Sequence, residues 1–231
     1  MTLNNKKLEF FSVVILTLIT IVFFWDGDLD IGLASLFFDA GNIENNWPKQ
    51  QFWLWGLLFD IAKPLLLICL LSALVLLIIG VFNEKVAKFR YRASYIILVI
   101  AIGPGLLVNL VLKDHWGRPR PRDIVEFNGQ YKYVSPSVIA ETGGKSFVCG
   151  HCSAAYMFFS FYFILNKGRS LVLCLTLCYS FLMGVTRMSA GGHFVSDILL
   201  SGSVVFFTCW FLYYYIFREF KQKVIKFPNK A

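Results

Sequence analysis

Six long apolar runs, separated by short breaks that hold most of the charged residues, constrain the fold of this chain more than any other feature. A membrane-spanning α-helix needs about 20 apolar residues, and suitable runs lie at about 9–25, 57–82, 93–112, 147–165, 170–188 and 197–217. Of the 231 residues, 57% are hydrophobic and only 16% are charged, which is more apolar surface than a soluble domain of this length can bury. The sequence therefore predicts a single all-α domain, residues 1–231, with six transmembrane helices.

The distribution of Lys and Arg predicts which ends of these helices face the cytoplasm. Four segments collect basic residues, and they alternate as six spans with both termini inside require. The first break, about 26–51, is acidic and is expected outside. The net charge of +8 is confined to such breaks, a pattern typical of contact with anionic lipid headgroups rather than with nucleic acid. The inner basic residues are Lys6, Lys7, Lys85, Lys88, Arg90, Arg92, Lys167, Arg169, Arg218, Lys221, Lys223, Lys226 and Lys230.

The third break, about 113–146, is expected outside and yet is rich in Lys and Arg. An anion-binding role explains this departure from the usual charge rule. The break opens with Lys113 and includes Arg120. A lysine provides a point charge and an arginine a planar fork of donors, and both suit phosphate oxygens. A miscounted span is the simpler alternative, but it conflicts with the agreement among the four basic inner segments.

Two further clusters lie at the same predicted membrane surface. Cys149, Gly150 and His151 open the fourth run, where a helix N-terminus and a glycine favour close approach of an anion. At the fifth and sixth runs, Arg187 can hold transition-state oxygens, while Asp197 can fix the tautomer of His193 and leave its other nitrogen free to attack. His151 can protonate the leaving oxygen.

Each of these residues also has a purely structural interpretation. Lys113 alone is typical of a snorkelling anchor, Asp197 of a helix cap, and a lone histidine of a buried hydrogen-bonding group. Their coincidence at one surface favours a site that binds and cleaves a phosphate ester of a membrane lipid.

The chain resembles the type 2 phosphatidic acid phosphatase superfamily, in which Lys-x6-Arg-Pro, Pro-Ser-Gly-His and Ser-Arg-x5-His-x3-Asp follow one another. This sequence reads Lys113-x6-Arg120-Pro121, Val148-Cys149-Gly150-His151 and Thr186-Arg187-x5-His193-x3-Asp197. The resemblance implies a phosphohistidine enzyme that needs no metal or cofactor. It assigns His193 as nucleophile, Asp197 as its orienting carboxylate, His151 as general acid, and Lys113, Arg120, Arg187 and Gly150 as phosphate ligands. Cys149 replaces a hydroxyl donor by a weaker thiol donor, so we expect altered rather than lost phosphate binding.

Residues 102–121, 126–129 and 146–150 are further similar to bacterial lipid A 4′-phosphatases. That resemblance implies an enzyme of the bacterial inner membrane with a periplasmic active site and the 4′-phosphate of lipid A as substrate. Undecaprenyl diphosphate, phosphatidylglycerol phosphate and the lipid A 1-phosphate are alternative substrates of related enzymes. Sugar or second-phosphate contacts are expected from His115, Trp116, Arg118 and Arg122.

Two other classes of protein remain open at this point. Cys149-Gly-His-Cys152 is a Cys-x-x-Cys at a helix start, which suggests a membrane thiol–disulfide oxidoreductase. That interpretation leaves the cationic clusters unexplained and lacks the βαβ context of the soluble redox motif. An anion transporter is the third possibility, although such proteins favour charged or broken helices near the membrane midplane.

Overall fold

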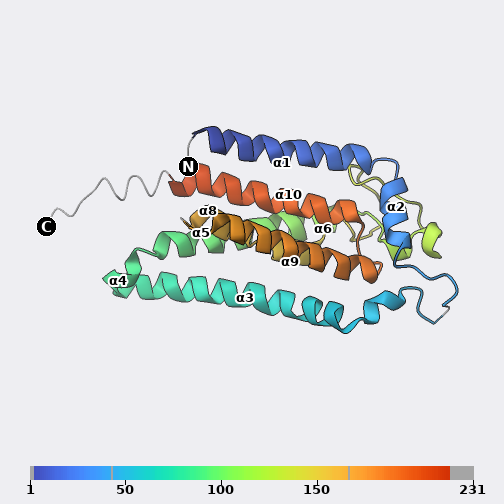
Figure 1. The fold of residues 1–231 in the computed structure, drawn as a ribbon, viewed down its shortest axis with the longest axis horizontal. Helices are drawn as coiled ribbons and strands as arrows, with labels where there is room; N and C mark the ends of the chain where they lie inside the picture. Colours follow the sequence, from blue (N-terminus) through green and yellow to red (C-terminus); the bar gives the residue numbers. More distant parts are fainter. Residues whose placement is uncertain (1–2, 43, 166, 219–231) are drawn as a thin grey trace.

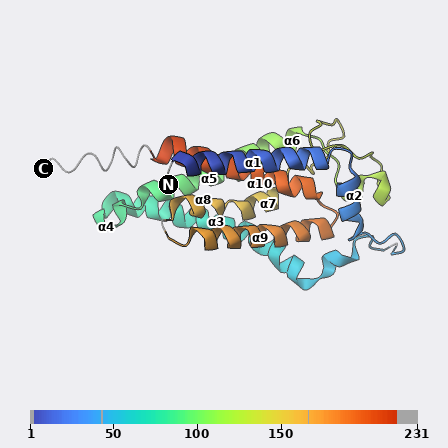
Figure 2. The same ribbon diagram turned by 45° about the horizontal axis from the view of Figure 1, so that its top comes forward.

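The computed structural model of the protein describes residues 3–42, 44–165 and 167–218, and its regular elements are helices (Figure 1). The elements are α1 (Leu3–Phe23), α2 (Asp28–Ser35), η1 (Pro48–Gln51), α3 (Trp53–Phe82), α4 (Glu84–Ala87), α5 (Arg90–Ile100), η2 (Ala101–Leu112), α6 (Lys113–His115), η3 (Pro121–Asp123), η4 (Val125–Phe127), α7 (Gly150–Tyr156), α8 (Phe159–Ile164), α9 (Arg169–Ser189), α10 (Val195–Phe211) and η5 (Leu212–Phe217). Long helices lie side by side and form an elongated bundle. The short helices α7 and α8 lie within it, and α2, α4 and the loops lie toward its two ends (Figures 1 and 2).

Four helices among the described residues are long and apolar enough to cross a membrane: Trp53–Phe82, Arg90–His115, Arg169–Ser189 and Val195–Phe217. They contain the predicted spans at 57–82, 93–112, 170–188 and 197–217. A fifth candidate arises if α1 and α2, which are bent by 83° at their junction, are taken as one broken span. The run at 147–165 forms two short helices, α7 and α8, rather than one long helix.

Gly103-Pro104-Gly105 lies in a π-helical stretch, η2, that continues α5 toward α6. A proline cannot donate the backbone hydrogen bond of a regular helix, and a π-turn is one way to absorb that defect. The side chain of Asn109 donates a hydrogen bond to the carbonyl of Pro104 at 2.6 Å. The helix therefore passes the proline and delivers Lys113 to its far end.

One end of the bundle gathers the start of α1, the short helix α4 and the start of α9 (Figures 1 and 2). Here the Glu9 carboxylate accepts hydrogen bonds from Tyr162 and Tyr214, at 2.8 and 2.9 Å. Lys6 Nζ lies 3.9 Å from the centroid of the Tyr215 ring. Three of the four basic segments expected inside thus lie at this end. Of the C-terminal segment, Lys221, Lys223, Lys226 and Lys230 lie outside the described residues.

The opposite end is closed by α2 and by the long loop between α6 and α7 (Figure 2). A small apolar cluster of Ala34, Trp47, Ile124, Phe127 and Phe194 fastens these segments to the start of α10. Gly191, in the turn between α9 and α10, has a φ of +58°, and any side chain there would lie within 2.4 Å of the Trp47 ring. The turn that carries His193 thus depends on glycine.

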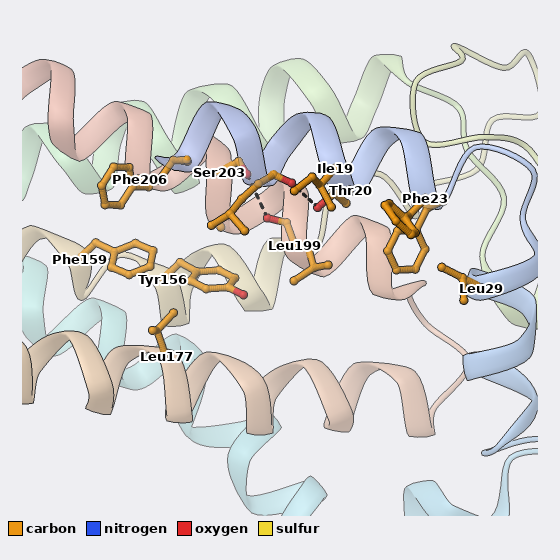
Figure 3. Close-up of a pocket in the computed structure, with 14 residues that line it drawn as sticks. Ile19, Thr20, Phe23, Leu29, Tyr156, Phe159, Leu177, Leu199, Ser203 and Phe206 are labelled. Atoms are coloured by element: carbon orange, nitrogen blue, oxygen red, sulfur yellow. Dashed lines mark hydrogen bonds between the residues drawn. The ribbon is translucent and has the colours of Figure 1, made fainter. Parts of the chain in front are cut away.

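An apolar cavity of about 410 Å³ lies between α1, α10, α9 and the α7–α8 segment (Figure 3). Residues such as Leu16, Phe159, Leu177, Leu199 and Phe206 line it, and none of its lining residues is charged. A site for phosphate chemistry therefore has to be sought elsewhere, at the polar end of the bundle.

Candidate active site

The first two sequence motifs meet at the start of α7. A side chain on Gly150 would lie 2.7 Å from Asn109 Oδ1 and 3.4 Å from Lys113 Nζ, so the Lys113 ammonium lies directly beside the backbone of Gly150. Glycine at the first position of α7 leaves room for this approach. The helix N-terminus and the lysine charge thereby face the same small volume, and both favour an anion.

Phe59, on α3, joins the second motif to the third. Its ring stacks on the His151 imidazole with the centroids 4.3 Å apart, and the Arg187 guanidinium carbon lies 5.0 Å from the centroid of the same ring. One aromatic side chain therefore contacts both the expected general acid and an expected phosphate ligand.

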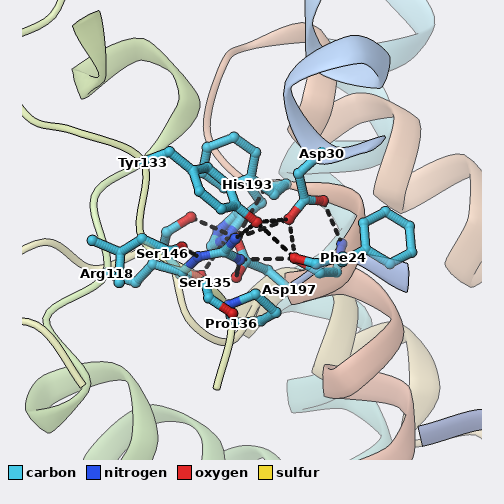
Figure 4. Close-up of polar contacts among 12 residues, drawn as sticks. Phe24, Asp30, Arg118, Tyr133, Ser135, Pro136, Ser146, His193 and Asp197 are labelled. Carbon is cyan, nitrogen blue, oxygen red and sulfur yellow. Dashed lines mark hydrogen bonds and ion pairs between the residues drawn. The ribbon is translucent and has the colours of Figure 1, made fainter. Parts of the chain in front are cut away.

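His193 follows the turn after α9 and is fully buried, with a relative exposure of 1%. Its Nδ1 lies 2.6 Å from the backbone carbonyl of Ser146, and 3.8 Å from Asp197 Oδ2 (Figure 4). A carbonyl oxygen can only accept, so Nδ1 carries the hydrogen and the lone pair is on Nε2. Ser146 therefore fixes the tautomer directly, while Asp197 contributes its charge from one step further away.

The Asp197 carboxylate is itself held on several sides (Figure 4). Oδ2 accepts from the Ser146 hydroxyl at 2.6 Å and from the Phe194 amide at 2.9 Å, and Oδ1 accepts from Arg118 at 2.5 Å. Burial alone disfavours a charged imidazole, but the Cys149 sulfur in its thiolate form and the Asp197 carboxylate raise the pKa of His193.

Three buried nitrogens in this region have no hydrogen-bond partner among the described residues: Arg120 Nε, Arg187 Nε and His151 Nε2. Buried polar atoms are normally paired. Burial lowers the pKa of Arg120, and the neighbouring Arg122 and Arg187 charges lower it further, while Asp123 offsets part of this shift. Unpaired donors in a cationic pocket are the features expected of an anion site.

The donors of the site are cationic and neutral. The part of the chain that the structure describes has no group of three or more His, Cys, Asp or Glu side chains placed to hold a metal ion. Cys149 and Cys152 are free thiols whose sulfur atoms are in contact. Cys149 Sγ accepts a hydrogen bond from the Cys152 amide at 3.3 Å and so caps α7.

The expected secondary contacts differ in their surroundings. His115 lies on the surface with Nδ1 2.9 Å from the Val111 carbonyl, and Arg122 is exposed beside Asp123. Trp116 stacks on Phe147, with the centroids 4.4 Å apart.

The expectation for Arg118 is wrong. Its side chain has a relative exposure of 0% and its donors are occupied by protein acceptors, so it cannot contact a sugar or a second phosphate. Arg118 lies two residues before Arg120 in the same basic stretch, and the sequence does not reveal that its side chain turns into the interior. Phe59, Ser146 and Asp30 were also missed as site residues. Ser146 stands in a segment that already resembled lipid A 4′-phosphatases, but its carbonyl contact with His193 depends on the folded backbone.

Comparison with known proteins adds independent information. The model of the PAP2 superfamily matches residues 93–221, in agreement with the resemblance found in the sequence. The chain is 32% identical over 217 residues to a lipid A 4′-phosphatase of Francisella tularensis subsp. novicida (strain U112), covering 89% of this chain and 96% of that protein. It is 31% identical over 197 residues to a lipid A 4′-phosphatase of Rhizobium leguminosarum, covering 77% and 84%. A phosphatidylglycerophosphatase B of Bacillus subtilis (strain 168) is 26% identical over 146 residues, covering 62% and 66%. No solved structure matches the chain.

Proposed function

The chain belongs to the PAP2 superfamily, and from that premise we propose that it is a membrane lipid phosphatase whose substrate is the 4′-phosphate of lipid A. Two relatives of that name, each matched over more than three quarters of its length, support this substrate. The match to a phosphatidylglycerophosphatase B keeps other lipid phosphates as competing substrates. These are phosphatidylglycerol phosphate, undecaprenyl diphosphate and the 1-phosphate of lipid A.

The observation that carries the proposal is the set of unpaired buried nitrogens on Arg120, Arg187 and His151. The charges of Arg187 and His193 act on His151, and the charge of Arg187 also acts on Arg120, so these groups surround one region. Phosphate oxygens would accept from the two guanidinium groups, from Lys113 and from the start of α7 at Gly150 and Cys149. A phosphate bound in this way would place its phosphorus atom next to the lone pair on His193 Nε2.

The reaction then proceeds in two balanced steps. His193 Nε2 forms a bond to phosphorus while the bond from phosphorus to the lipid oxygen breaks, and His151 donates a proton to that oxygen. A water molecule next attacks the phosphohistidine, gives its proton back to His151 and releases inorganic phosphate. Asp197 stabilises the positive charge that His193 gains in the first step.

The membrane arrangement is part of the same proposal. We place six spans in the inner membrane of a bacterium, with α7 and α8 together forming the fourth, one domain over residues 1–231, and both termini in the cytoplasm. The collection of Lys6, Lys88 and Arg169 at one end of the bundle supports this orientation. The catalytic groups lie at the other end, which would face the periplasm.

The test is a panel of lipid phosphates incubated with the purified full chain in nanodiscs, with release of the 1- and 4′-phosphates of lipid A followed separately. Preferential 4′-release that is lost in His193→Ala, in protein that still inserts, is the expected result. Turnover that persists without His193 would reject the nucleophile. Activity lost in Cys152→Ser but retained in His193→Ala would instead favour a thiol–disulfide oxidoreductase.

A further inference from the structure

Arg118 has the largest side chain among the fully buried residues that the structure describes. It sits between two carboxylates, donating to Asp30 at 2.8 Å and to Asp197 at 2.5 Å (Figure 4). It also donates to the Val134 carbonyl and the Ser196 hydroxyl, each at 2.8 Å, and to the Tyr133 hydroxyl at 2.9 Å. Because its N–H groups donate to these acceptors, the buried guanidinium is held in one geometry.

Asp30 reaches this site from α2, whose direction is set by the bend after α1. Tyr133 fixes the bend, because its hydroxyl donates to the Phe24 carbonyl at 3.0 Å and lies 3.0 Å from Asp30 Oδ2. Asp30 Oδ1 also accepts from the backbone amide of Ser196 at 3.0 Å. The acidic segment that precedes the second span therefore contributes one carboxylate to the interior, next to the helix that carries Asp197.

We propose that Asp30 and Arg118 are positioning residues that set how much of the Asp197 charge is available to His193, an inference that rests on the proposed phosphatase function. Arg118 alone would neutralise Asp197. Asp30 shares the guanidinium, so the three groups keep one net negative charge. The buried cluster is then neutral when His193 becomes positive, as it does when its bond to phosphorus forms.

Other groups face the same imidazole or its immediate partners, and they stay unchanged in the variants described below. They are Asp197 from α10, Cys149 and His151 from the start of α7, Cys152 behind Cys149, Arg187 from the end of α9 and Lys113 from α6. The groups that face Asp30 are Arg118, Tyr133 and Asp197. Burial disfavours the charged form of Arg118, but the carboxylates of Asp197 and Asp30 outweigh burial and raise the pKa of Arg118. The guanidinium therefore stays charged at every working pH.

The proposal predicts opposite effects for two substitutions. Asp30→Asn removes a negative charge and should lower the pKa of His193 by about one unit. This is the order expected for loss of a unit charge that lies a few ångströms further from His193 than Asp197 does, at an effective dielectric constant of about 20. Arg118→Met removes a positive charge and should raise that pKa. The double variant Asp30→Asn/Arg118→Met has the wild-type net charge and should return the pKa toward the wild-type value.

The experiment is a pH titration of the full chain, labelled with 15N-histidine, in nanodiscs. The chain has only three histidines, and His193→Ala assigns the signal. The acidic limb of the kcat/KM profile is measured on the same samples and should move with the pKa, because attack needs a neutral imidazole. Asp28→Asn, the same change at an exposed position two residues earlier in α2, should leave both unchanged.

A merely structural role predicts a different pattern, in which the double variant is the most damaged and neither single variant moves the His193 pKa. That result, or a shift of the same sign in both single variants, overturns the proposal. If Arg118→Met fails to fold, the test rests on the other two variants: Asp30→Asn should lower the His193 pKa, and the double variant should return it toward the wild-type value. The titration needs no turnover: opposite pKa shifts in a protein that releases no phosphate would retain the charge-sharing and reject the proposed function instead.

Discussion

Ser146→Ala removes one hydroxyl from the support of the nucleophile and leaves the backbone carbonyl that holds His193. The hydroxyl donates to Asp197 at 2.6 Å in a fully buried place. A hydrogen bond to a charged group contributes about 1.5–3 kcal/mol. The Phe194 amide and Arg118 still hold the carboxylate, so we expect it to shift rather than to lose its place. At about 1.4 kcal/mol for each factor of ten, kcat/KM should fall about 10- to 150-fold if the loss is felt in the transition state.

The assay is release of phosphate from the preferred lipid, with thermal unfolding measured on the same preparation. Ser160→Ala is the matched control, because that hydroxyl is equally buried but has no hydrogen-bond partner among the described residues. It should leave kcat/KM near the wild-type value. Unchanged kcat/KM and unchanged unfolding in Ser146→Ala would refute the reasoning, since the hydroxyl would then contribute nothing to Asp197.

Three further predictions concern the walls of the pocket and its protonation. Phe59→Leu should lower kcat/KM several-fold, because the stacked Phe59 ring orients His151. Phe59→Tyr keeps the ring and should be close to wild type. Equal kcat/KM values in the two variants would contradict an orienting role for the ring. Gly150→Ala should raise KM for the lipid phosphate more than it lowers kcat, because the added methyl group intrudes beside Lys113. An unchanged KM in steady-state kinetics would count against a phosphate-binding site at the start of α7. The pKa of His193 is raised above the ordinary value of about 6.5 for histidine, so the neutral, nucleophilic form is lost as the pH falls through this raised pKa. The acidic limb of the kcat/KM profile should therefore have its midpoint above about 6.5. A midpoint well below that value would oppose the assignment of His193 as nucleophile.

Much of the helical layout could be predicted from the sequence, because apolar run length and Lys/Arg placement respond to the bilayer. The four long helices follow from that pattern. The division of the fourth run into α7 and α8 does not, because the break at Met157 and Phe158 carries no proline or glycine and both of its residues are apolar. Hydrophobicity reports which residues avoid water and says little about where a buried helix is interrupted.

The candidate catalytic residues were visible in the sequence because each motif combines residue types that phosphate requires. Residues that act through backbone or through burial were not. Ser146 contributes a carbonyl oxygen, which any residue has, and Phe59 is one of 24 phenylalanines. Arg118 has the composition of a surface anion ligand but is buried between Asp30 and Asp197. The pairing of residues 30 and 118 depends on how α2 folds over the loop, which local sequence patterns do not encode.

The most direct test of the account is to identify the covalent intermediate. The full chain is mixed with a lipid substrate that carries 32P in the cleaved phosphate, the reaction is stopped by denaturation at alkaline pH, and the labelled peptide is sequenced by mass spectrometry. We predict an alkali-stable, acid-labile phosphate on His193 that appears and decays at the rate of turnover. Label on Cys149 or His151 instead, or turnover at full rate with no phosphoenzyme at any time, would contradict the assignment of His193 as the group that attacks phosphorus.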